Sequence, residues 1–183
     1  MNVLIACEFS GIVRDEFSQW GHYAVSADLL PSERPGHHYI GDVRDLFHLQ
    51  WDLMIAFPPC THLAISGALH FKAKRDSGVQ EQALQFVRDL LAAPIDKVCI
   101  ENPISIISTR IRKPDQIIQP WMFGHGEVKA TCLWLKNLPL LIPTNRVSGR
   151  APVRHYLNQG AERWKLRSST YAGIAHAMAV QWY

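Results

Sequence analysis

A cysteine and a glutamate each follow a short apolar segment of this chain that reads as a buried strand. Cys60 ends the run Phe57–Cys60 (FPPC) after residues 51–56, and Glu101 opens the run Glu101–Pro103 (ENP) after residues 95–100. In open α/β sheets, ligands bind beyond the carboxyl ends of the strands. If the two strands are neighbours, Cys60 and Glu101 project into one crevice. The pair then offers a thiol nucleophile facing a carboxyl acid.

The surrounding pattern predicts alternating strands and helices. We expect strands over residues 3–7, 23–28, 51–56, 95–100 and 129–134, and helices over residues 12–20, 80–93 and 173–182. This alternation is typical of an α/β fold with a parallel sheet and helices on both faces. At 183 residues, of which 48% are hydrophobic, the chain predicts a single domain over residues 1–183.

Basic residues concentrate in one part of the chain. Residues 146–167 hold six Lys and Arg against a single acid, Glu162, whereas the formal charge of the whole chain is only +3. Tyr156 and Trp164 lie among them. Basic residues interleaved with aromatics are typical of a phosphate-contacting face, so we expect a substrate-contacting segment at about 145–167. A solvated basic loop is the alternative reading. The same two readings apply to residues 61–80, which we expect to form a loop after Cys60.

The four cysteines, at positions 7, 60, 99 and 132, are widely spaced. This spacing argues against a disulfide framework and against a zinc knuckle, and we expect no metal site. Three of the cysteines lie in or beside apolar runs and are expected in the core, whereas Cys60 follows two prolines. No apolar run approaches about 20 residues and no basic leader precedes the first strand, so we expect a cytoplasmic protein with no membrane partner.

The turn after the first strand indicates the kind of cofactor. Glu8–Gly11 (EFSG) has one glycine and is therefore not the GxGxxG cradle of a dinucleotide. It fits the looser turn of adenosyl-type cofactor sites, in which an acid at the end of the second strand, here Asp28, hydrogen-bonds ribose hydroxyls. Asp42, after Gly41, would then lie near an adenine ring. Each acid alternatively caps a turn or a helix.

Taken in order, these segments resemble the DNA (cytosine-5) methyltransferase family. The resemblance rests on Glu8–Gly11, Asp28, Gly41–Asp42, Pro58–Cys60 and Glu101–Pro103, over roughly the first two thirds of the chain. Residues 123–136 and 167–179 are similar to compact, phage-encoded members. The family implies a Rossmann-like sheet that binds S-adenosylmethionine, a tail helix that closes the cofactor pocket, and a bacterial or phage-infected cell.

The resemblance also implies roles for individual residues. Cys60 would add to carbon 6 of cytosine, and Glu101 would protonate ring nitrogen 3. Cofactor contacts fall on Glu8, Phe9, Ser10, Gly11, Asp28, Asp42, Val43 and Phe57. Substrate contacts fall on Pro59, Asn102, Lys129, Arg163 and Arg167. Lys129 stands where the family has an arginine-containing motif, and Asn102 is placed to join the two loops by hydrogen bonds.

Several alternatives stay open at this point. Glu101 could instead cap a helix or pair with Arg110 or Arg112. The few tens of residues between position 136 and the closing helix are too few for a separate recognition domain. We therefore expect methylation of cytosine carbon 5 in DNA with low or short sequence specificity, on a base flipped from a duplex or in a single strand. The alternatives are the same chemistry on a free cytidine nucleotide, or a non-catalytic cofactor-binding or DNA-binding protein. An amino-methyltransferase is disfavoured, because Phe57 and Cys60 replace the polar and aromatic residues of its Pro-Pro turn.

Overall fold

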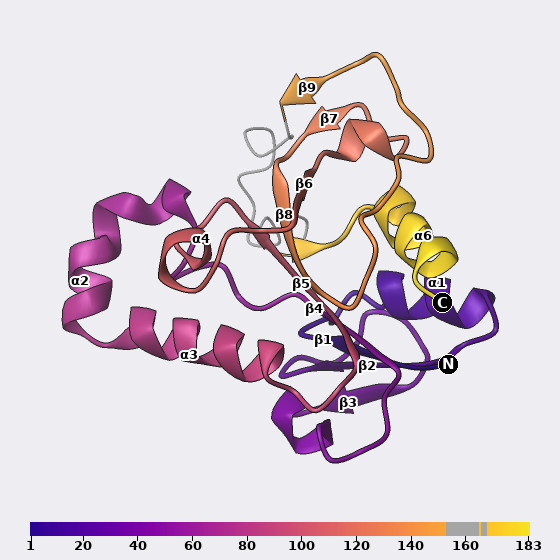
Figure 1. The fold of residues 1–183 in the computed structure, drawn as a ribbon, viewed down its shortest axis with the longest axis horizontal. Helices are drawn as coiled ribbons and strands as arrows, with labels where there is room; N and C mark the ends of the chain where they lie inside the picture. Colours follow the sequence, from indigo (N-terminus) through magenta and orange to yellow (C-terminus); the bar gives the residue numbers. More distant parts are fainter. Residues whose placement is uncertain (153–164, 166–167) are drawn as a thin grey trace.

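The computed structural model describes residues 1–152, 165 and 168–183. At its centre is a seven-stranded sheet in the order β3-β2-β1-β4-β5-β8-β6 (Figure 1). The strands are β1 (Asn2–Ala6), β2 (Tyr23–Asp28), β3 (His38–Ile40), β4 (Leu53–Ala56), β5 (Lys97–Pro103), β6 (Gln116–Ile118) and β8 (Thr131–Lys136). Strands β3, β2, β1, β4 and β5 run parallel to one another. Strand β8 runs antiparallel to both β5 and β6. Strand order reverses between β1 and β4, which makes the sheet doubly wound and Rossmann-like.

The central strands bury both of their faces, because alternate side chains point to opposite sides of the sheet. In β1, Val3 and Ile5 pack on one side, whereas Leu4 and Ala6 pack on the other. Strands β4, β5 and β8 divide between the two cores in the same way. Strands buried on both faces have nearly continuous apolar sequences. This explains why residues 51–56 and 95–100 predict strands.

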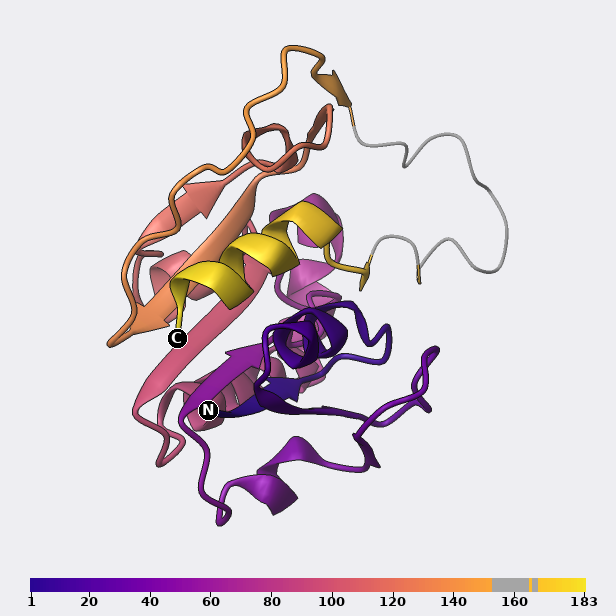
Figure 2. The same ribbon diagram turned by 90° about the vertical axis from the view of Figure 1, so that its right-hand side faces the viewer.

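Helices cover both faces of the sheet, as predicted. Helices α1 (Ile12–Gln19) and α6 (Ala172–Gln181) lie side by side on one face (Figure 2). On the other face, α3 (Val79–Leu91) packs together with the short helices α4 (Ile107–Arg110) and η1 (Val43–Leu46). The predicted bounds of α1, α3 and α6 agree with the structure to within two residues. Short elements such as α4 and β6 were not predicted, because a segment of three or four residues is too short to show a periodic pattern of apolar residues.

A small lobe lies beyond the sheet and is formed by η3 (Pro120–Met122), β7 (Glu127–Val128) and β9 (Ala151–Pro152) (Figure 1). Strand β7 pairs with β9 in parallel. Helix α6 begins against this lobe, where the Gly173 amide donates a hydrogen bond to His125 Nε2 at 3.0 Å. A Cβ atom on Gly173 would collide with the carbonyl oxygen of Phe123. Glycine is therefore needed where α6 meets the lobe.

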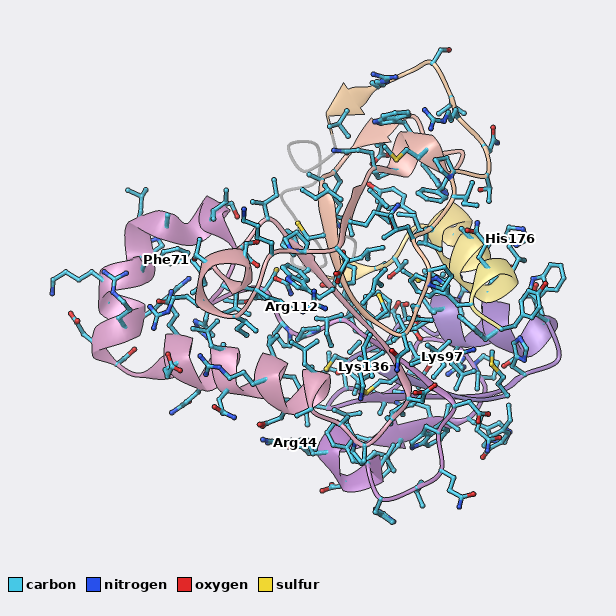
Figure 3. The ribbon with its side chains drawn as sticks, viewed as in Figure 1. Arg44, Phe71, Lys97, Arg112, Lys136 and His176 are labelled. Carbon is cyan, nitrogen blue, oxygen red and sulfur yellow. The ribbon has the colours of Figure 1, made fainter. Side chains whose placement is uncertain are left out.

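Residues 61–80, predicted as a loop, are largely helical. The 3₁₀ helix η2 (Ile65–His70) leads into α2 (Phe71–Asp76), and we call residues 65–78 the arm. Figure 3 shows Phe71 of the arm and His176 of α6 at opposite ends of the molecule. Helix η2 is interrupted at Gly67, and neither η2 nor α2 has a buried residue. The prediction was wrong because a helix without a buried face shows no apolar periodicity.

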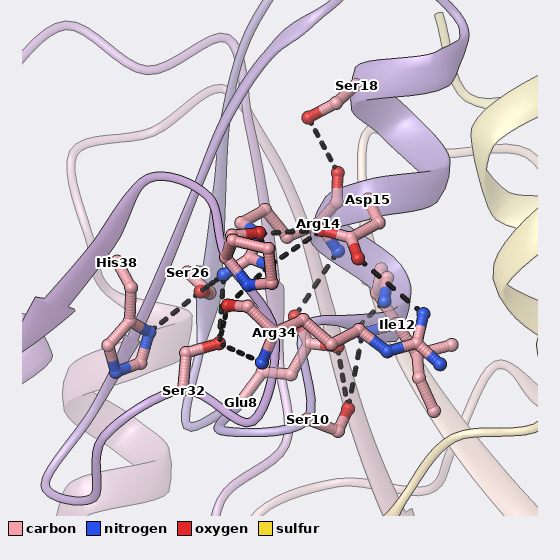
Figure 4. Close-up of polar contacts among 12 residues, drawn as sticks. Glu8, Ser10, Ile12, Arg14, Asp15, Ser18, Ser26, Ser32, Arg34 and His38 are labelled. Carbon is pink, nitrogen blue, oxygen red and sulfur yellow. Dashed lines mark hydrogen bonds and ion pairs between the residues drawn. The ribbon is translucent and has the colours of Figure 1, made fainter.

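A buried arginine holds the turn between β1 and α1. Arg14 is only 1% exposed, and its guanidinium donates hydrogen bonds to the hydroxyls of Ser26 on β2 and Ser32 in the next loop (Figure 4). The same group donates to the Pro35 carbonyl oxygen at 2.9 Å and pairs with Asp15 at 2.7 Å. One side chain therefore connects α1, β2 and the loop that follows β2.

The cysteines are distributed as the sequence indicates. Cys99 and Cys132 are buried, Cys7 is partly buried and Cys60 is exposed. In residues 1–152, 165 and 168–183, no cluster of three His, Cys, Asp or Glu could hold a metal ion. Within the described part of the chain, no helix is both long and apolar enough to cross a membrane.

We predict that Arg14→Met lowers the free energy of unfolding by about 3 kcal/mol, because it leaves the buried Ser26 hydroxyl and the Pro35 carbonyl oxygen without the Arg14 donor. Urea unfolding monitored by circular dichroism would measure this loss. Arg34, half exposed and 3.5 Å from Asp15, is the matched control. Arg34→Met should cost less than about 1 kcal/mol. Equal effects of the two substitutions would contradict the role assigned to Arg14.

Candidate functional site

Cys60 and Glu101 follow neighbouring parallel strands. Ala56, the last residue of β4, pairs with Ile100 on β5, so Glu101 lies one position past this pair, opposite the start of the Phe57–Cys60 run. Both runs therefore leave the sheet at its carboxyl edge. Strand order reverses between β1 and β4, which places the expected ligand crevice at this same edge. The two strands are neighbours, which is the condition that the sequence analysis set for Cys60 and Glu101 to face one crevice.

Hydrogen bonds tie the two runs together. The side chain of Asn102, 1% exposed, donates from Nδ2 to the Pro58 carbonyl oxygen at 2.8 Å. Farther along, the Ile65 amide donates to the Ile104 carbonyl oxygen at 3.1 Å. Asn102 thus joins the two loops, as the sequence indicated. The segment that carries Cys60 is fixed to the strand that carries Glu101.

The Cys60 segment also has a turn of its own. The amides of Leu63 and Ala64 both donate to the Cys60 carbonyl oxygen, at 3.0 and 2.9 Å. Pro59 is exposed beside it. The chain therefore turns directly after the cysteine, which leaves the Cys60 residue exposed at the surface.

Glu101 opens into a pocket between β5, β8 and the start of α6. The residues lining this pocket are Glu101, Lys129, Thr131, Ser168, Ser169, Thr170, Tyr171 and Ile174. Desolvation raises the pKa of Glu101, and the Lys129 charge and a hydrogen bond with Thr131 partly offset the rise. Arg110 and Arg112 pair with other acids, Glu81 and Asp115. The protonated form of this carboxyl is therefore favoured more than that of an ordinary glutamate.

A second set of contacts links Lys129 to the tail helix. The Lys129 ammonium lies 5.7 Å from the centre of the Tyr171 ring, which attracts the cation through its π-face. The Tyr171 hydroxyl donates to Glu127 of β7, and burial raises the pKa of Tyr171. His125 packs against the other side of this arrangement, with its ring centre 5.0 Å from that of Tyr171. Lys129 was predicted to contact the substrate. His125, Glu127 and Tyr171 lie in the segments similar to phage-encoded members but had no predicted role, because their contacts join segments about 40 residues apart.

In the predicted cofactor turn, the polar side chains hydrogen-bond to one another and to the start of α1. The Glu8 carboxylate, 5% exposed, accepts hydrogen bonds from the Val13 and Arg14 amides at 2.7 and 3.3 Å, at the start of α1. Ser10 donates to Glu8 at 3.1 Å, and Gly11 takes a left-handed φ of 72° before the helix. Phe9 is buried. The Glu8 and Ser10 side chains thus shape the turn, and burial raises the pKa of Glu8.

The two predicted acids gather with Cys7 at the carboxyl ends of β1, β2 and β3. Burial, with the Asp28 and Asp42 charges, raises the pKa of Cys7 to about 12. Asp28 is partly buried, which raises its pKa, and it accepts a hydrogen bond from the Leu30 amide at 3.0 Å. The Asp42 carboxylate instead binds Arg44 at 2.6 Å, which lowers the pKa of Asp42. Asp28 therefore lies at the strand end where the sequence predicts a ribose contact, whereas Arg44 occupies the carboxylate of Asp42.

Apolar side chains flank these acids. Val43 is buried under the site and Phe57 is partly buried at the end of β4. The structure adds Leu29, 76% exposed directly after Asp28, and Ile40, 60% exposed at the end of β3. The sequence analysis missed these two residues. An apolar residue next to a strand-end acid is the signal that could have identified Leu29.

The predicted substrate-contacting segment is only partly described. Arg163 and Arg167, with most of residues 145–167, lie outside the described residues. The described part contains Arg150 and Arg146, whose guanidinium carbons lie 4.0 and 5.9 Å from the centre of the Trp121 ring. Both arginines are exposed on the small lobe. The Trp121 contact holds two cations at the surface beside β7 and β9.

Comparison with known proteins shows the class of fold. Neither a protein-family model nor a curated protein matches the chain. Among solved structures, it is similar to an E. coli protein, encoded within a prophage, that is proposed to be a DNA modification methyltransferase, with a TM-score of 0.52 and 13% identity. The match covers 80% of this chain and 52% of that one, so the chain spans about half the length of its neighbour. The fold is therefore the Rossmann-like sheet with helices on both faces that the sequence predicts.

We predict that Glu101→Gln stabilises the protein in a pH-dependent way. A carboxyl whose folded pKa is raised contributes full stability below its unfolded pKa of about 4.5 and loses it as pH rises through the folded value. The variant should therefore gain little in melting temperature at pH 5 and more at pH 8, as measured by scanning calorimetry. Glu81→Gln, on the exposed face of α3, is the control and should show no such trend. A gain that is the same at both pH values would contradict the raised pKa.

Proposed function

We propose that this protein transfers a methyl group from S-adenosylmethionine to carbon 5 of cytosine in DNA, through a covalent adduct with Cys60. The observation that carries the proposal is that an exposed cysteine and a desolvated glutamate follow adjacent parallel strands, and that Asn102 joins the two segments by a hydrogen bond. The methyltransferase fold supports the proposal, as does the description of its structural neighbour. The family resemblance supplies the particular reaction.

The residues at the switch in strand order fit an adenosyl cofactor. Asp28 offers a partly buried carboxylate to ribose hydroxyls, and Leu29 and Ile40 offer apolar surface to an adenine. Val43 and Phe57 complete the proposed contacts, with Glu8 and Ser10 shaping the turn beside them. When bound, S-adenosylmethionine would supply an electrophilic methyl group.

Cys60 and Glu101 would divide the activation of the base between them. The Cys60 thiolate adds to carbon 6 of cytosine and its electron pair becomes the new sulfur–carbon bond. Glu101 gives its proton to ring nitrogen 3, so that the electron pair of the carbon 5–carbon 6 double bond is held as an enamine. Carbon 5 becomes nucleophilic as a result. After methylation, a base removes the carbon-5 proton, the Cys60 sulfur leaves with its electron pair, and Glu101 recovers its proton. The raised pKa of Glu101 suits a group that must begin protonated.

Exposed cations beside the site support DNA as the substrate. The small lobe presents Arg146 and Arg150 on Trp121, and the arm that follows Cys60 carries Lys72, Lys74 and Arg75. Lysine and arginine side chains contact phosphates and add affinity without reading sequence. The lobe is small, so we expect low or short sequence specificity. Pro59, Asn102, Lys129, Arg163 and Arg167 remain the proposed substrate contacts.

We predict a covalent adduct with DNA that contains 5-fluorocytosine. A base can remove hydrogen from carbon 5 as a proton, but it cannot remove fluorine in the same way. The reaction should therefore stop after methyl transfer, with Cys60 still attached to the base. Incubation with labelled S-adenosylmethionine should give a band that survives denaturing electrophoresis. Cys60→Ala should abolish the band, and Glu101→Gln should slow its formation by about 100-fold.

The same experiment separates the alternatives. An adduct with a fluorinated cytidine nucleotide, but none with DNA, would move the proposal to a nucleotide substrate. Cofactor binding without any adduct would count for a non-catalytic binding protein. An adduct that persists in Cys60→Ala would exclude Cys60 as the nucleophile.

We also predict that Lys129 sets the alkaline limit of the reaction. The Lys129 charge lowers the pKa of Glu101, so its removal in Lys129→Met raises that pKa further. Because Glu101 acts as an acid, the fall in kcat/KM at high pH should move to higher pH in the variant. Lys97, at the opposite end of β5 (Figure 3), is the control, and Lys97→Met should leave the profile in place. A shift to lower pH would contradict the acid role of Glu101.

A further inference from the structure

Helix α6 begins without a capping side chain of its own. Tyr171 is its N-cap residue, and the Tyr171 side chain makes no capping hydrogen bond. The first amides of a helix have no acceptor within the helix, and a Ser, Thr, Asp or Asn side chain usually supplies one. Here the acceptor comes from the small lobe, because the Gly173 amide donates to His125 Nε2 at 3.0 Å. His125 therefore caps α6 from a position 48 residues away in the sequence.

His125 is held from the lobe and from the tail. Its amide donates to the Pro120 carbonyl oxygen at 3.1 Å, and its own carbonyl oxygen accepts from the Glu127 amide at 2.6 Å. The imidazole packs on the ring of Tyr171, with the two ring centres 5.0 Å apart. These contacts fix the backbone and the ring of His125 beside the start of α6.

The hydrogen bond from Gly173 requires a neutral imidazole. Nε2 must offer a lone pair to accept the amide proton, so the proton of the neutral ring lies on Nδ1. A second proton turns Nε2 into a donor, which then faces the donating Gly173 amide. It also places a positive charge at the N-terminus of α6, where the helix dipole favours negative charge. Protonation of His125 therefore opposes the contact in two ways.

Other charged groups lie on the elements that meet at His125. On the lobe and the adjoining segment they are Glu127, Lys129, Arg146 and Arg150. On α6, His176 pairs with Glu16 of α1 at 2.7 Å, and protonation of His176 strengthens this pair. The two histidines thus act on α6 in opposite directions, because a proton weakens the contact of His125 and strengthens that of His176.

We infer that neutral His125 is a positioning residue that seats α6 beside the catalytic acid, and that protonation of His125 releases this seat. The inference rests on the proposed function, because it takes Glu101 as the acid of the reaction. Tyr171 and Ile174, at the start of α6, line the pocket of Glu101. When the cap is lost, this wall of the pocket loosens. His125 acts through the tail and not on the reacting atoms.

NMR of protein labelled with ¹⁵N tests the seat without requiring methyl transfer. At about pH 8, long-range proton–nitrogen spectra should show His125 Nε2 without a proton. Protection of the Gly173 amide from hydrogen exchange, relative to an unstructured peptide at the same pH, should fall by about tenfold as His125 gains its second proton toward about pH 5.5. A proton on Nε2 at the higher pH, or equal protection at both pH values, would overturn the inference.

Two substitutions at position 125 separate the cap from simple packing. His125→Gln keeps an acceptor at the reach of Nε2 but does not titrate, so Gly173 should stay protected at both pH values. His125→Ala removes the acceptor, and protection should be about tenfold lower at both. His176→Gln, on the same helix, is the matched control and should keep the wild-type fall in protection. A loss of protection at acid pH in His125→Gln would mean that another group titrates, and would overturn the inference.

The pH profile of methyl transfer connects the seat to the reaction. Protonation of the Cys60 thiolate gives the logarithm of kcat/KM an acid-side slope of about 1, and protonation of His125 should steepen it toward about 2. His125→Gln should keep a slope of about 1 throughout, and His176→Gln should follow the wild type. A wild-type slope that stays at about 1 while the Gly173 amide loses its protection would overturn the positioning role. A wild type that transfers no methyl group, yet releases Gly173 on protonation of His125, would overturn the proposed function and leave the seat standing.

Discussion

The hydrogen bond from Asn102 to the Pro58 carbonyl oxygen is the contact on which the site depends. Residues 58 and 59 are prolines, so this stretch has no backbone N–H with which to continue pairing beyond β4. Asn102 replaces that pairing from the neighbouring strand, at 2.8 Å and out of contact with water. The position of the Cys60 segment is thereby set by the strand that carries Glu101. Together with the backbone hydrogen bond from Ile65 to Ile104, this contact holds the two loops as one unit.

The acid is positioned from the opposite direction, through the tail of the chain. Gly173 lets α6 begin directly against the lobe, which places Tyr171 over Lys129, and the Lys129 charge in turn acts on Glu101. Each step is an ordinary contact. Together they make the protonation of Glu101 depend on how α6 is seated. The tail helix therefore does more than cover one face of the sheet.

The sequence could predict elements whose apolar residues form a continuous or periodic run. Examples are the strand that precedes Cys60 and the helix that buries Leu84. It could not predict contacts between distant segments. Arg14 lies on an amphipathic helix and resembles a surface residue, yet it is buried because Ser26 and the loop after β2 surround it. The arm was mistaken for a loop for a related reason, since neither of its helices has a buried face. Apolar periodicity indicates which residues are buried. Arg14 is buried although it is charged, and the arm is helical although it has no buried face.

Exposure separates the four thiols chemically, and this separation favours one nucleophile. Burial raises the pKa of Cys7 to about 12 and of Cys132 to about 11, and raises that of Cys99 well above its ordinary value. A thiol in such surroundings stays protonated and unreactive at neutral pH. Cys60 is the exposed cysteine, on a segment hydrogen-bonded to the strand that carries Glu101, an acid whose pKa desolvation raises. The reaction needs an ionised thiol and a neutral carboxyl at the same pH. The fold desolvates the acid, which favours the neutral carboxyl, and it leaves the Cys60 thiol exposed on the neighbouring loop.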